Sequence, residues 1–421
     1  MRGKHCRLIV LAPLLSAAAS DHLFVEPVRI LQEWHGEAPN DQFGWIARNL
    51  GDVDGDGIND VTTSAPSHGS DAGRIYVFSA RSGTLLWRAD GKKGDQLGIG
   101  IEAAGDTNRD GTADVIAAAP GAGWATIYSG RDGKVLRTFR SKTSDEVFGR
   151  HVAGVGDFNK DGYADVLIGA PGQDGESKIS GSAYVFSGKD GQLLLELRGE
   201  RGGDRFGSAV SGYSDEKEQM LVIGAPGAGA SRHGRVYVYK MSSAQPQFTF
   251  DADESGRALG AMFVSVPGDL DGDGAQDIYA SDWANAAKGR STGRVYAYSG
   301  KNGALLFALT GESAGEGLGT SSATAGDVDR DGRPDLIVGA WQYGGAAVSG
   351  GRAYLYSGRD GKLLKTFTSR TPNETLGFDA VGLGDIDGDG AADLLITSGW
   401  SGVKGVHSGR VFIISSSHLD R

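Results

Sequence analysis

The chain has 421 residues, among them 69 glycines, 11 prolines and one cysteine, and its formal net charge is −11. Glycine is more than twice as frequent as usual, but there is no Gly-X-Y period, so a collagen is excluded. A hydrophobic content of 39% argues against a disordered chain. The acidic balance argues against nucleic acid or an anionic membrane as a partner held by general charge.

The first 20 residues have the pattern of a signal peptide. Arg2, Lys4 and Arg7 form a basic start, residues 8–15 are an apolar run too short to span a bilayer, and residues 17–19 are small. The alternative is a buried N-terminal helix. We expect export to the periplasm, the cell surface or the medium, and a mature chain without cysteine whose net charge is −14, from 39 basic and 53 acidic residues. No later apolar run is long enough for a membrane helix.

A repeated phrase covers the rest of the chain. It begins with Phe-Gly or Leu-Gly, reaches Gly-Asp through a small apolar run, and continues with an acidic loop, a second apolar run and often Gly-Ala-Pro. The seven copies start at residues 43, 97, 148, 206, 259, 318 and 376, which lie 51 to 59 residues apart. Such a period is typical of propeller blades.

Each copy contains four short strand-like runs, which in the third copy are residues 152–155, 166–169, 183–187 and 193–197. A Ser-Gly-Lys/Arg-Asp/Asn-Gly turn joins the last two runs, as hairpins require. The pattern predicts an all-β fold, a seven-bladed β-propeller of four-stranded antiparallel blades that fills residues 21–421 as a single domain. The alternative is an open array of hairpins.

The two ends of the repeated region predict how the ring closes. The last copy stops at its third strand, residues 411–415, while an unpaired strand-like run at residues 28–34 precedes the first copy. We expect this N-terminal strand to complete the last blade, because the third strand would otherwise have an open edge. Residues 21–25 lie outside the run, and we expect their removal to matter little.

Six copies carry the loop Asp-x-Asp/Asn-x-Asp-Gly-x-x-Asp between their first two strands. Calcium takes six to eight oxygen ligands in tolerant geometry, whereas magnesium demands a stricter octahedron. Side chains at loop positions one, three, five and nine, with the backbone carbonyl at position seven, can converge on one ion, and glycine at position six permits the turn. We therefore expect about six Ca²⁺ ions. The candidate ligands are Asp52, Asp54, Asp56, Ile58 and Asp60; Asp106, Asn108, Asp110, Thr112 and Asp114; Asp157, Asn159, Asp161, Tyr163 and Asp165; Asp269, Asp271, Asp273, Ala275 and Asp277; Asp327, Asp329, Asp331, Arg333 and Asp335; and Asp385, Asp387, Asp389, Ala391 and Asp393.

The fourth copy departs from the pattern. Its segment at residues 211–220 is shorter and lacks the aspartate series. We expect no calcium in blade four. The last carboxylate of the other loops stands at position nine rather than twelve, and strands flank the loop, so these are not EF-hands.

The recurring Phe-Gly, acidic loop and Gly-Ala-Pro elements resemble the FG-GAP repeat, and residues 28–421 resemble the β-propeller of integrin alpha chains and related bacterial exported proteins. The resemblance implies seven blades, with calcium in hairpin loops on one face and partner binding on the opposite face. It also implies a bacterial, extracellular protein. The chain differs from integrins in having no leg domains and no inserted ligand-binding domain, and it has more calcium loops, so an integrin-like signalling role does not follow.

The loops between the second and third strands vary in length, which favours their face as a binding surface. Trp124, Trp283, Trp341 and Trp400 lie in or beside these loops and could stack on sugars or grip a protein, although wedging between blades is the alternative. We find no catalytic signature. We expect a monomeric binding or adhesion module for an extracellular protein or glycan. A secreted carbohydrate-active enzyme of the polysaccharide lyase kind is the alternative, favoured if carboxylates, arginines or histidines converge in a central cleft.

Overall fold

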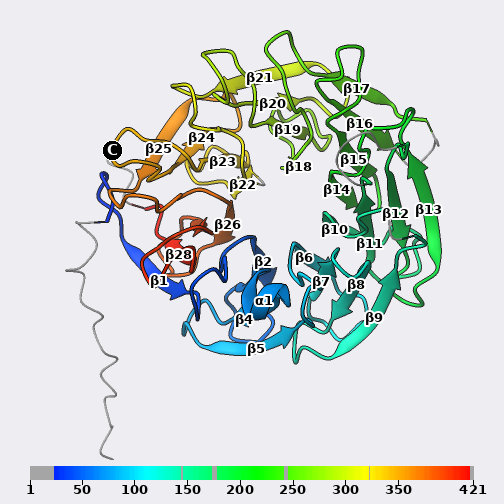
Figure 1. Cartoon of the computed structure of the whole chain (residues 1–421), viewed down its shortest axis with the longest axis horizontal. Coiled ribbons are helices and arrows are strands. Elements are labelled where there is room, and N and C mark those ends of the chain that lie inside the picture. Colours follow the sequence, from blue (N-terminus) through cyan, green and yellow to red (C-terminus); the bar gives the residue numbers. More distant parts are fainter. Residues whose placement is uncertain (1–22, 144–145, 173–177, 241–244, 322, 418–421) are drawn as a thin grey trace, which may run out of the picture.

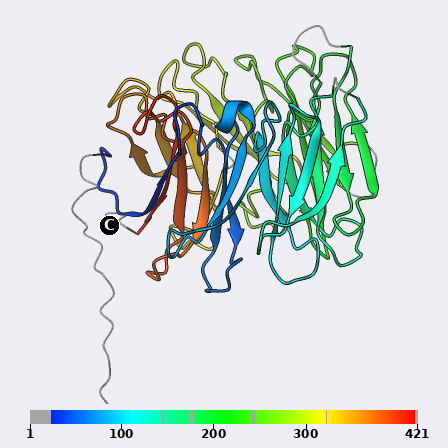
Figure 2. The ribbon, with the colours of Figure 1, turned by 60° about the horizontal axis from the view of Figure 1, so that its bottom comes forward.

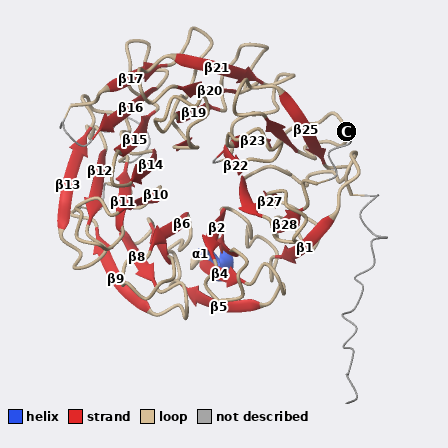
Figure 3. Ribbon diagram, turned by 180° about the vertical axis from the view of Figure 1, so that it is seen from behind, coloured by secondary structure: helices blue, strands red, loops and turns tan. Residues whose placement is uncertain are grey.

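The computed structural model describes residues 23–143, 146–172, 178–240, 245–321 and 323–417. Within these ranges, 28 strands form seven four-stranded antiparallel sheets, arranged as blades around a central axis (Figure 1). Strands and loops make up almost the whole ring (Figure 3). The predicted all-β, seven-bladed propeller is confirmed. The predicted signal peptide at residues 1–20 lies outside the described residues.

The blades are numbered one to seven by their inner strands in chain order. The inner strands are β2 (Ala47–Gly51), β6 (Gly100–Gly105), β10 (Val152–Gly156), β14 (Ala209–Ser214), β18 (Val264–Ser265), β22 (Ala323–Gly326) and β26 (Ala380–Gly384). The second strands are β3 (Asp60–Ala65), β7 (Asp114–Ala119), β11 (Asp165–Ala170), β15 (Gln219–Ala225), β19 (Ile278–Asp282), β23 (Asp335–Ala340) and β27 (Asp393–Ser398). The third strands are β4 (Arg74–Phe78), β8 (Trp124–Tyr128), β12 (Ser182–Phe186), β16 (Arg235–Lys240), β20 (Arg294–Tyr298), β24 (Arg352–Tyr356) and β28 (Arg410–Ile414). The outer strands are β5 (Leu85–Asp90), β9 (Val135–Arg140), β13 (Leu193–Arg198), β17 (Phe248–Asp251), β21 (Leu305–Thr310), β25 (Leu363–Thr368) and β1 (Ile30–His35).

The hydrophobic core lies between the blades. Second strands such as β11 and β23 are buried at every position, because neighbouring sheets cover both of their faces. Their sequences are accordingly continuous apolar runs. One apolar cluster joins β10 and β11 of blade three to β14 and β15 of blade four, and others join other neighbouring blades. Each blade thus needs its neighbours to bury its faces, as in other repeat proteins.

Helix is almost absent. Among the described residues the one helix is α1 (His68–Asp71), a single turn between β3 and β4 whose Gly69 and Ser70 have φ angles of 65° and 63°. No helix in the described part of the chain is long and apolar enough to cross a membrane.

The ring closes as the strand count predicts. β1 pairs antiparallel with β28, with Trp34 opposite Val411 and His35 opposite Arg410, and so becomes the outer strand of blade seven. Trp34 also reaches the next blade, where its ring packs 5.0 Å from that of Phe78 and its Nε1 donates to the Gly83 carbonyl at 2.9 Å. The N-terminal strand therefore ties blade seven to blade one.

The expectation that residues 21–25 contribute little is wrong for the described part of that segment. Phe24 is only 2% exposed and packs edge-to-face on Phe412 at 5.6 Å. The Val25 amide donates to the carbonyl of Thr368, at the end of β25 in blade six. The segment before β1 therefore fastens the chain start to blade six as well as to blade seven.

The connections divide between the two edges of the ring, which Figure 2 shows in an oblique view. The acidic loops and the turns between third and outer strands lie at one edge, called here the acidic face. The loops between second and third strands and the connections between blades lie at the other, called the opposite face. On the opposite face each connection bonds to its neighbour's loop, as where the Leu97 amide donates to the Ala72 carbonyl.

Candidate functional site

The acidic loops are folded by their own carboxylates. In blade one, Asp52 Oδ1 accepts from the amides of Gly55 (2.7 Å) and Asp56 (3.1 Å), and Asp52 Oδ2 accepts from Gly57 (2.8 Å). Asp54 Oδ1 and Asp56 Oδ1 each accept from the amide two residues further on. Gly57, at position six, has a φ of 84°, which a side chain would strain. Within the described residues, no backbone amide donates to the second oxygens of Asp54 and Asp56, so these oxygens can face an ion.

The aspartate at position nine joins each loop to the rest of its blade. In blade three, Asp165 Oδ2 accepts from the Phe158 amide at 2.9 Å, and Oδ1 accepts from the Gly188 amide, in the turn after β12, at 3.0 Å. All six loops repeat this pair of bonds. The residues are Asp60, Asp114, Asp165, Asp277, Asp335 and Asp393. Burial raises the pKa of each of these carboxyls to about 6, against the opposing effect of the backbone donors.

Four loops bring three carboxylates together, with one oxygen of each within 4.8 Å of the others. The sets are Asp52, Asp54 and Asp60; Asp269, Asp271 and Asp273; Asp327, Asp329 and Asp335; and Asp385, Asp387 and Asp393. Two ligands on opposite sides of one Ca²⁺, each at about 2.4 Å, lie roughly 4.8 Å apart. The donor set and its spacing therefore fit a hard divalent cation.

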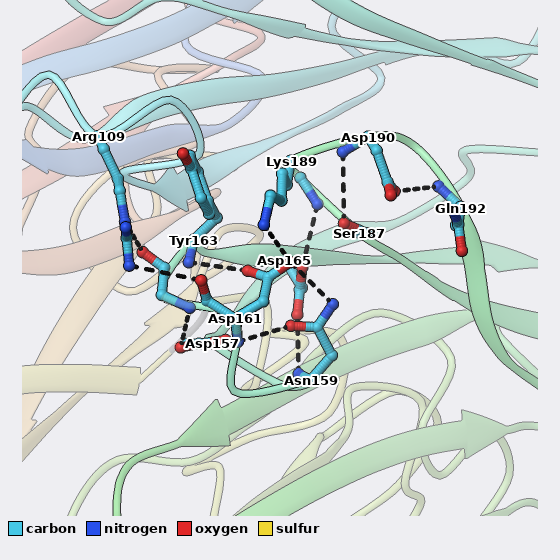
Figure 4. Close-up of polar contacts among 12 residues, drawn as sticks. Arg109, Asp157, Asn159, Asp161, Tyr163, Asp165, Ser187, Lys189, Asp190 and Gln192 are labelled. Atoms are coloured by element: carbon cyan, nitrogen blue, oxygen red, sulfur yellow. Dashed lines mark hydrogen bonds and ion pairs between the residues drawn. The ribbon is translucent and has the colours of Figure 1, made fainter.

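The loops of blades two and three differ at position three, which is an asparagine. The amide of Asn108 donates to Asp110 at 3.0 Å, and that of Asn159 donates to Asp161 at 3.2 Å (Figure 4). Each amide oxygen accepts from the same backbone donor that an aspartate would bind, since Asn159 Oδ1 accepts from the Asp161 amide at 3.0 Å. These two loops keep the backbone fold of the other four and offer one carboxylate fewer.

A basic side chain stands beside most of the acidic clusters. In blades one, three and six it comes from the turn after the third strand, and the pairs are Arg81 with Asp56 (2.9 Å), Lys189 with Asp161 (3.7 Å) and Arg359 with Asp331 (3.9 Å). The basic side chains are 47–67% exposed, so solvent screens the pairs and each contributes little to stability. An arriving divalent ion can displace them at small cost.

Blade seven obtains its basic partner from the chain start. Arg29, the residue before β1, pairs with Asp387 at 2.7 Å. Other links run between neighbouring loops. Arg109 of blade two donates to the Gly162 carbonyl of blade three at 2.6 Å and lies over the Tyr163 ring (Figure 4). The acidic loops are thus connected to one another as well as to their own blades.

Blade four replaces the acidic loop with a tight hairpin between β14 and β15. Asp215 Oδ1 accepts from the amides of Lys217 and Glu218 and so holds the turn. The Glu218 carboxylate pairs with Lys240 at 2.6 Å and accepts from the Gln276 amide of blade five at 3.1 Å. Here an ion pair and a backbone bond connect the hairpin to its surroundings.

Comparison with known proteins agrees with the geometry. A model of the FG-GAP repeat matches residues 43–78, 148–186 and 378–414, and a model of an FG-GAP-like repeat matches residues 269–338. The chain carries FG-GAP repeats.

Similar full-length proteins are integrin alpha chains. Integrin alpha-4 of Xenopus laevis is 29% identical over 254 residues, which are 55% of this chain and 23% of the relative. Integrin alpha-5 of the same species is 31% identical over 244 residues, 52% of this chain and 22% of the relative. Integrin alpha-2 of Bos taurus is 33% identical over 169 residues, 35% of this chain and 14% of the relative. The chain spans less than a quarter of the length of these relatives.

On the opposite face of the FG-GAP propeller, two of the four predicted tryptophans come together. Trp341 and Trp400 lie edge to face at 4.7 Å, Trp341 lies 5.6 Å from Phe378, and Phe378 lies 4.8 Å from Trp45. These four residues are called here the aromatic cluster. All except Phe378 are only half-buried, so they combine packing between blades six, seven and one with an exposed surface. Trp124 and Trp283 are also half-buried, on blades two and five.

The structure also reveals residues that sequence reasoning missed. Arg48 on β2 is buried in the central channel, where its Nε donates to Glu102 at 2.6 Å and its Nη1 donates to Asp379. Arg48 and Glu102 occupy the same place in successive repeats, since both stand four residues before position one of the acidic loop. An alignment of the repeats would have shown a basic and an acidic residue at one channel-facing position.

Proposed function

We propose that this FG-GAP propeller is an exported, calcium-stabilised module that binds an extracellular protein or glycan through its opposite face. The observation that supports the proposal is that the two faces carry different kinds of loop. One face repeats a nearly constant acidic loop six times. The other face carries loops of unequal length over the aromatic cluster. Regular scaffolds with variable loops are a common arrangement for recognition.

Calcium would act as a structural ion in this arrangement. Three carboxylates within 4.8 Å of one another repel by about 1 kcal/mol per pair in water and by several times more near a protein surface. An ion would reverse that repulsion. By binding carboxylates at positions one to five together with the position-nine aspartate, the ion would also join the loop to the turn after the third strand, whose amide already donates to that aspartate. Each loaded loop would therefore stiffen its whole blade and, through the blade faces, the recognition surface.

The recognition surface would centre on blades six and seven. Val348 is 73% exposed in the loop between β23 and β24, and Val406 is 65% exposed in the loop between β27 and β28. Trp400 lies in the same loop as Val406, with its ring 5.7 Å from that of His407. Exposed aliphatic groups beside half-buried tryptophans are typical of a protein or glycan contact rather than of a solvated edge.

The test is a screen of the calcium-loaded protein against glycan arrays and extracellular matrix proteins, followed by Val406→Asp. Val135→Asp is the matched control, because Val135 is 61% exposed but stands on outer strand β9. We expect Val406→Asp to abolish binding and Val135→Asp to leave it unchanged. Equal loss in both variants, or binding that survives Val406→Asp, would contradict the proposed face.

A further inference from the structure

The channel along the propeller axis is lined by two rings of structurally equivalent residues. The strand register gives the upper ring as Ile46, Gly100, His151, Ala209, Phe263, Ser321 and Asp379. The lower ring, two residues further along each inner strand, is Arg48, Glu102, Ala153, Ser211, Ser265, Ala323 and Val381. Side chains two apart on a strand share a face. Ile46 and Ala209 pack in the apolar clusters between blades, whereas the polar members of blades one, two, three and five meet at one cavity. Most polar members of the rings are on blades one to five.

A cavity of about 210 Å³ lies among these polar residues. Its lining includes Arg48, Glu102, His151, Phe263 and Ser265. The Glu102 side chain is 24% exposed, so solvent reaches the cavity. A cavity of this size suits one sugar ring and is too small for a folded peptide segment.

Two buried polar atoms at the cavity lack a hydrogen-bond partner among the described residues. They are Nε2 of His151 and Oγ of Ser265. His151 Nδ1 accepts from the Val210 amide at 3.4 Å, and burial, with help from Arg48 and Arg150, lowers the imidazole pKa to about 3. The imidazole is therefore neutral with its proton on Nε2, which makes that atom a donor without an acceptor. Buried polar groups left in this state are costly, so something must satisfy them.

The charges of the cavity favour a neutral occupant. Arg48 stands between Glu102 and Asp379, so its charge is already compensated, and an anion would meet two carboxyls. A metal cation would have to displace the guanidinium from between them. Burial raises the pKa of both carboxyls, against the effect of Arg48, which further limits the excess charge. The Phe263 ring adds an aromatic surface beside His151, at 5.9 Å between ring centroids.

We propose that the central channel holds a binding site for a single neutral, hydroxyl-rich ring, such as a monosaccharide or the terminal residue of a glycan. Each hydroxyl of such a ligand both donates and accepts. The ligand's hydroxyls can therefore accept a hydrogen bond from His151 Nε2, donate one to Glu102, and either donate to or accept from Ser265 Oγ. A carbon face of the ligand ring can lie on the Phe263 ring. A neighbouring pocket lined by His151 and Phe263 also reaches Trp45 and Phe378 of the aromatic cluster, but the inference does not rest on the proposed recognition surface.

The experiment titrates the calcium-loaded full chain with D-glucose, D-galactose, D-mannose and L-rhamnose, with D-glucuronate as the charged comparison, by saturation-transfer NMR and calorimetry. We expect one neutral sugar to bind saturably, with a Kd on the order of 1 mM. Ser265→Ala should weaken it roughly fivefold, as one lost hydrogen bond implies, and His151→Leu should weaken it at least as much. Ser82→Ala, in an exposed turn, should change nothing.

Several results would overturn the site. The first is that no neutral sugar binds saturably, which would leave ordered water as the occupant. The second is that glucuronate alone binds. The third is that Ser265→Ala and the parent protein bind the sugar with equal affinity. Melting curves of both channel variants guard against loss of fold. Binding of the sugar by Val406→Asp would show that the channel acts independently, so failure of the recognition surface and failure of the channel site can be told apart.

Discussion

The seam of the ring makes a quantitative prediction, because Trp34 of β1 and Trp87 of β5 have matching roles. Trp34 is 9% exposed and crosses from blade seven to blade one. Trp87 is 8% exposed and crosses from blade one to blade two, where its Nε1 donates to the Gly130 carbonyl at 2.6 Å. The chain runs directly from β5 of blade one into β6 of blade two, and from β1 into β2 of blade one, but only noncovalent pairing with β28 joins β1 to the rest of blade seven. Trp34→Ala therefore tests closure, and Trp87→Ala is its matched control.

The expected loss follows from the buried area. A tryptophan buries roughly 200 Å², worth about 5 kcal/mol at about 25 cal/mol per Å², and measured Trp→Ala changes cost about 3–5 kcal/mol. Roughly 390 folded residues unfold with an entropy of about 0.8 kcal/mol per degree, so Trp34→Ala should lower the Tm by about 4–6 °C.

Differential scanning calorimetry in calcium buffer measures the shift, and Trp87→Ala should give a similar one. If Trp34→Ala leaves the Tm unchanged while Trp87→Ala lowers it, β1 does not close the ring in solution.

Three further predictions concern the loops and the chain start. Chelator should lower the Tm and 10 mM calcium should raise it, since an ion bound with a Kd of about 1 mM adds about 1.4 kcal/mol per site; a melting curve indifferent to both would exclude a structural ion. Asp161→Ala should reduce the number of bound calcium ions by one, measured by equilibrium dialysis, because that aspartate belongs to the loop of blade three alone. Asp215→Ala in the hairpin of blade four is its control and should leave the count unchanged. Phe24→Ala should cost about 3–5 kcal/mol in chemical unfolding, because its ring is buried on Phe412, whereas Val25→Ser, at a position 45% exposed, should have little effect; equal effects would argue against the contact with blades six and seven.

The blades could be predicted from the sequence because their signals are local and repeated. Apolar runs of fixed length, Gly-containing turns and a constant period recur in every copy, and the closing strand followed from counting strands. Phe24 could not be found in this way, since it lies outside the repeats and is buried only where blades six and seven meet. The second bond of Asp165, to Gly188, joins residues 23 apart in the sequence, and nothing in the loop itself indicates it.

The channel residues were missed for a different reason. Arg48, Glu102 and Ser265 match no motif within their own repeats. They become neighbours only because the ring brings equivalent positions of different repeats together. Asp379 shows the same dependence, because it pairs with Arg48 across the seam, 331 residues away in the sequence. Periodicity predicts the ring, whereas the chemistry at its axis depends on the differences between the repeats.

We propose that six of the seven blades hold a calcium ion in their acidic loops. The most direct measurement is elemental analysis of the protein after equilibrium dialysis against millimolar calcium, read as ions bound per chain. We expect six ions per chain in the parent protein and five in Asp161→Ala. Two or fewer ions per chain would contradict it.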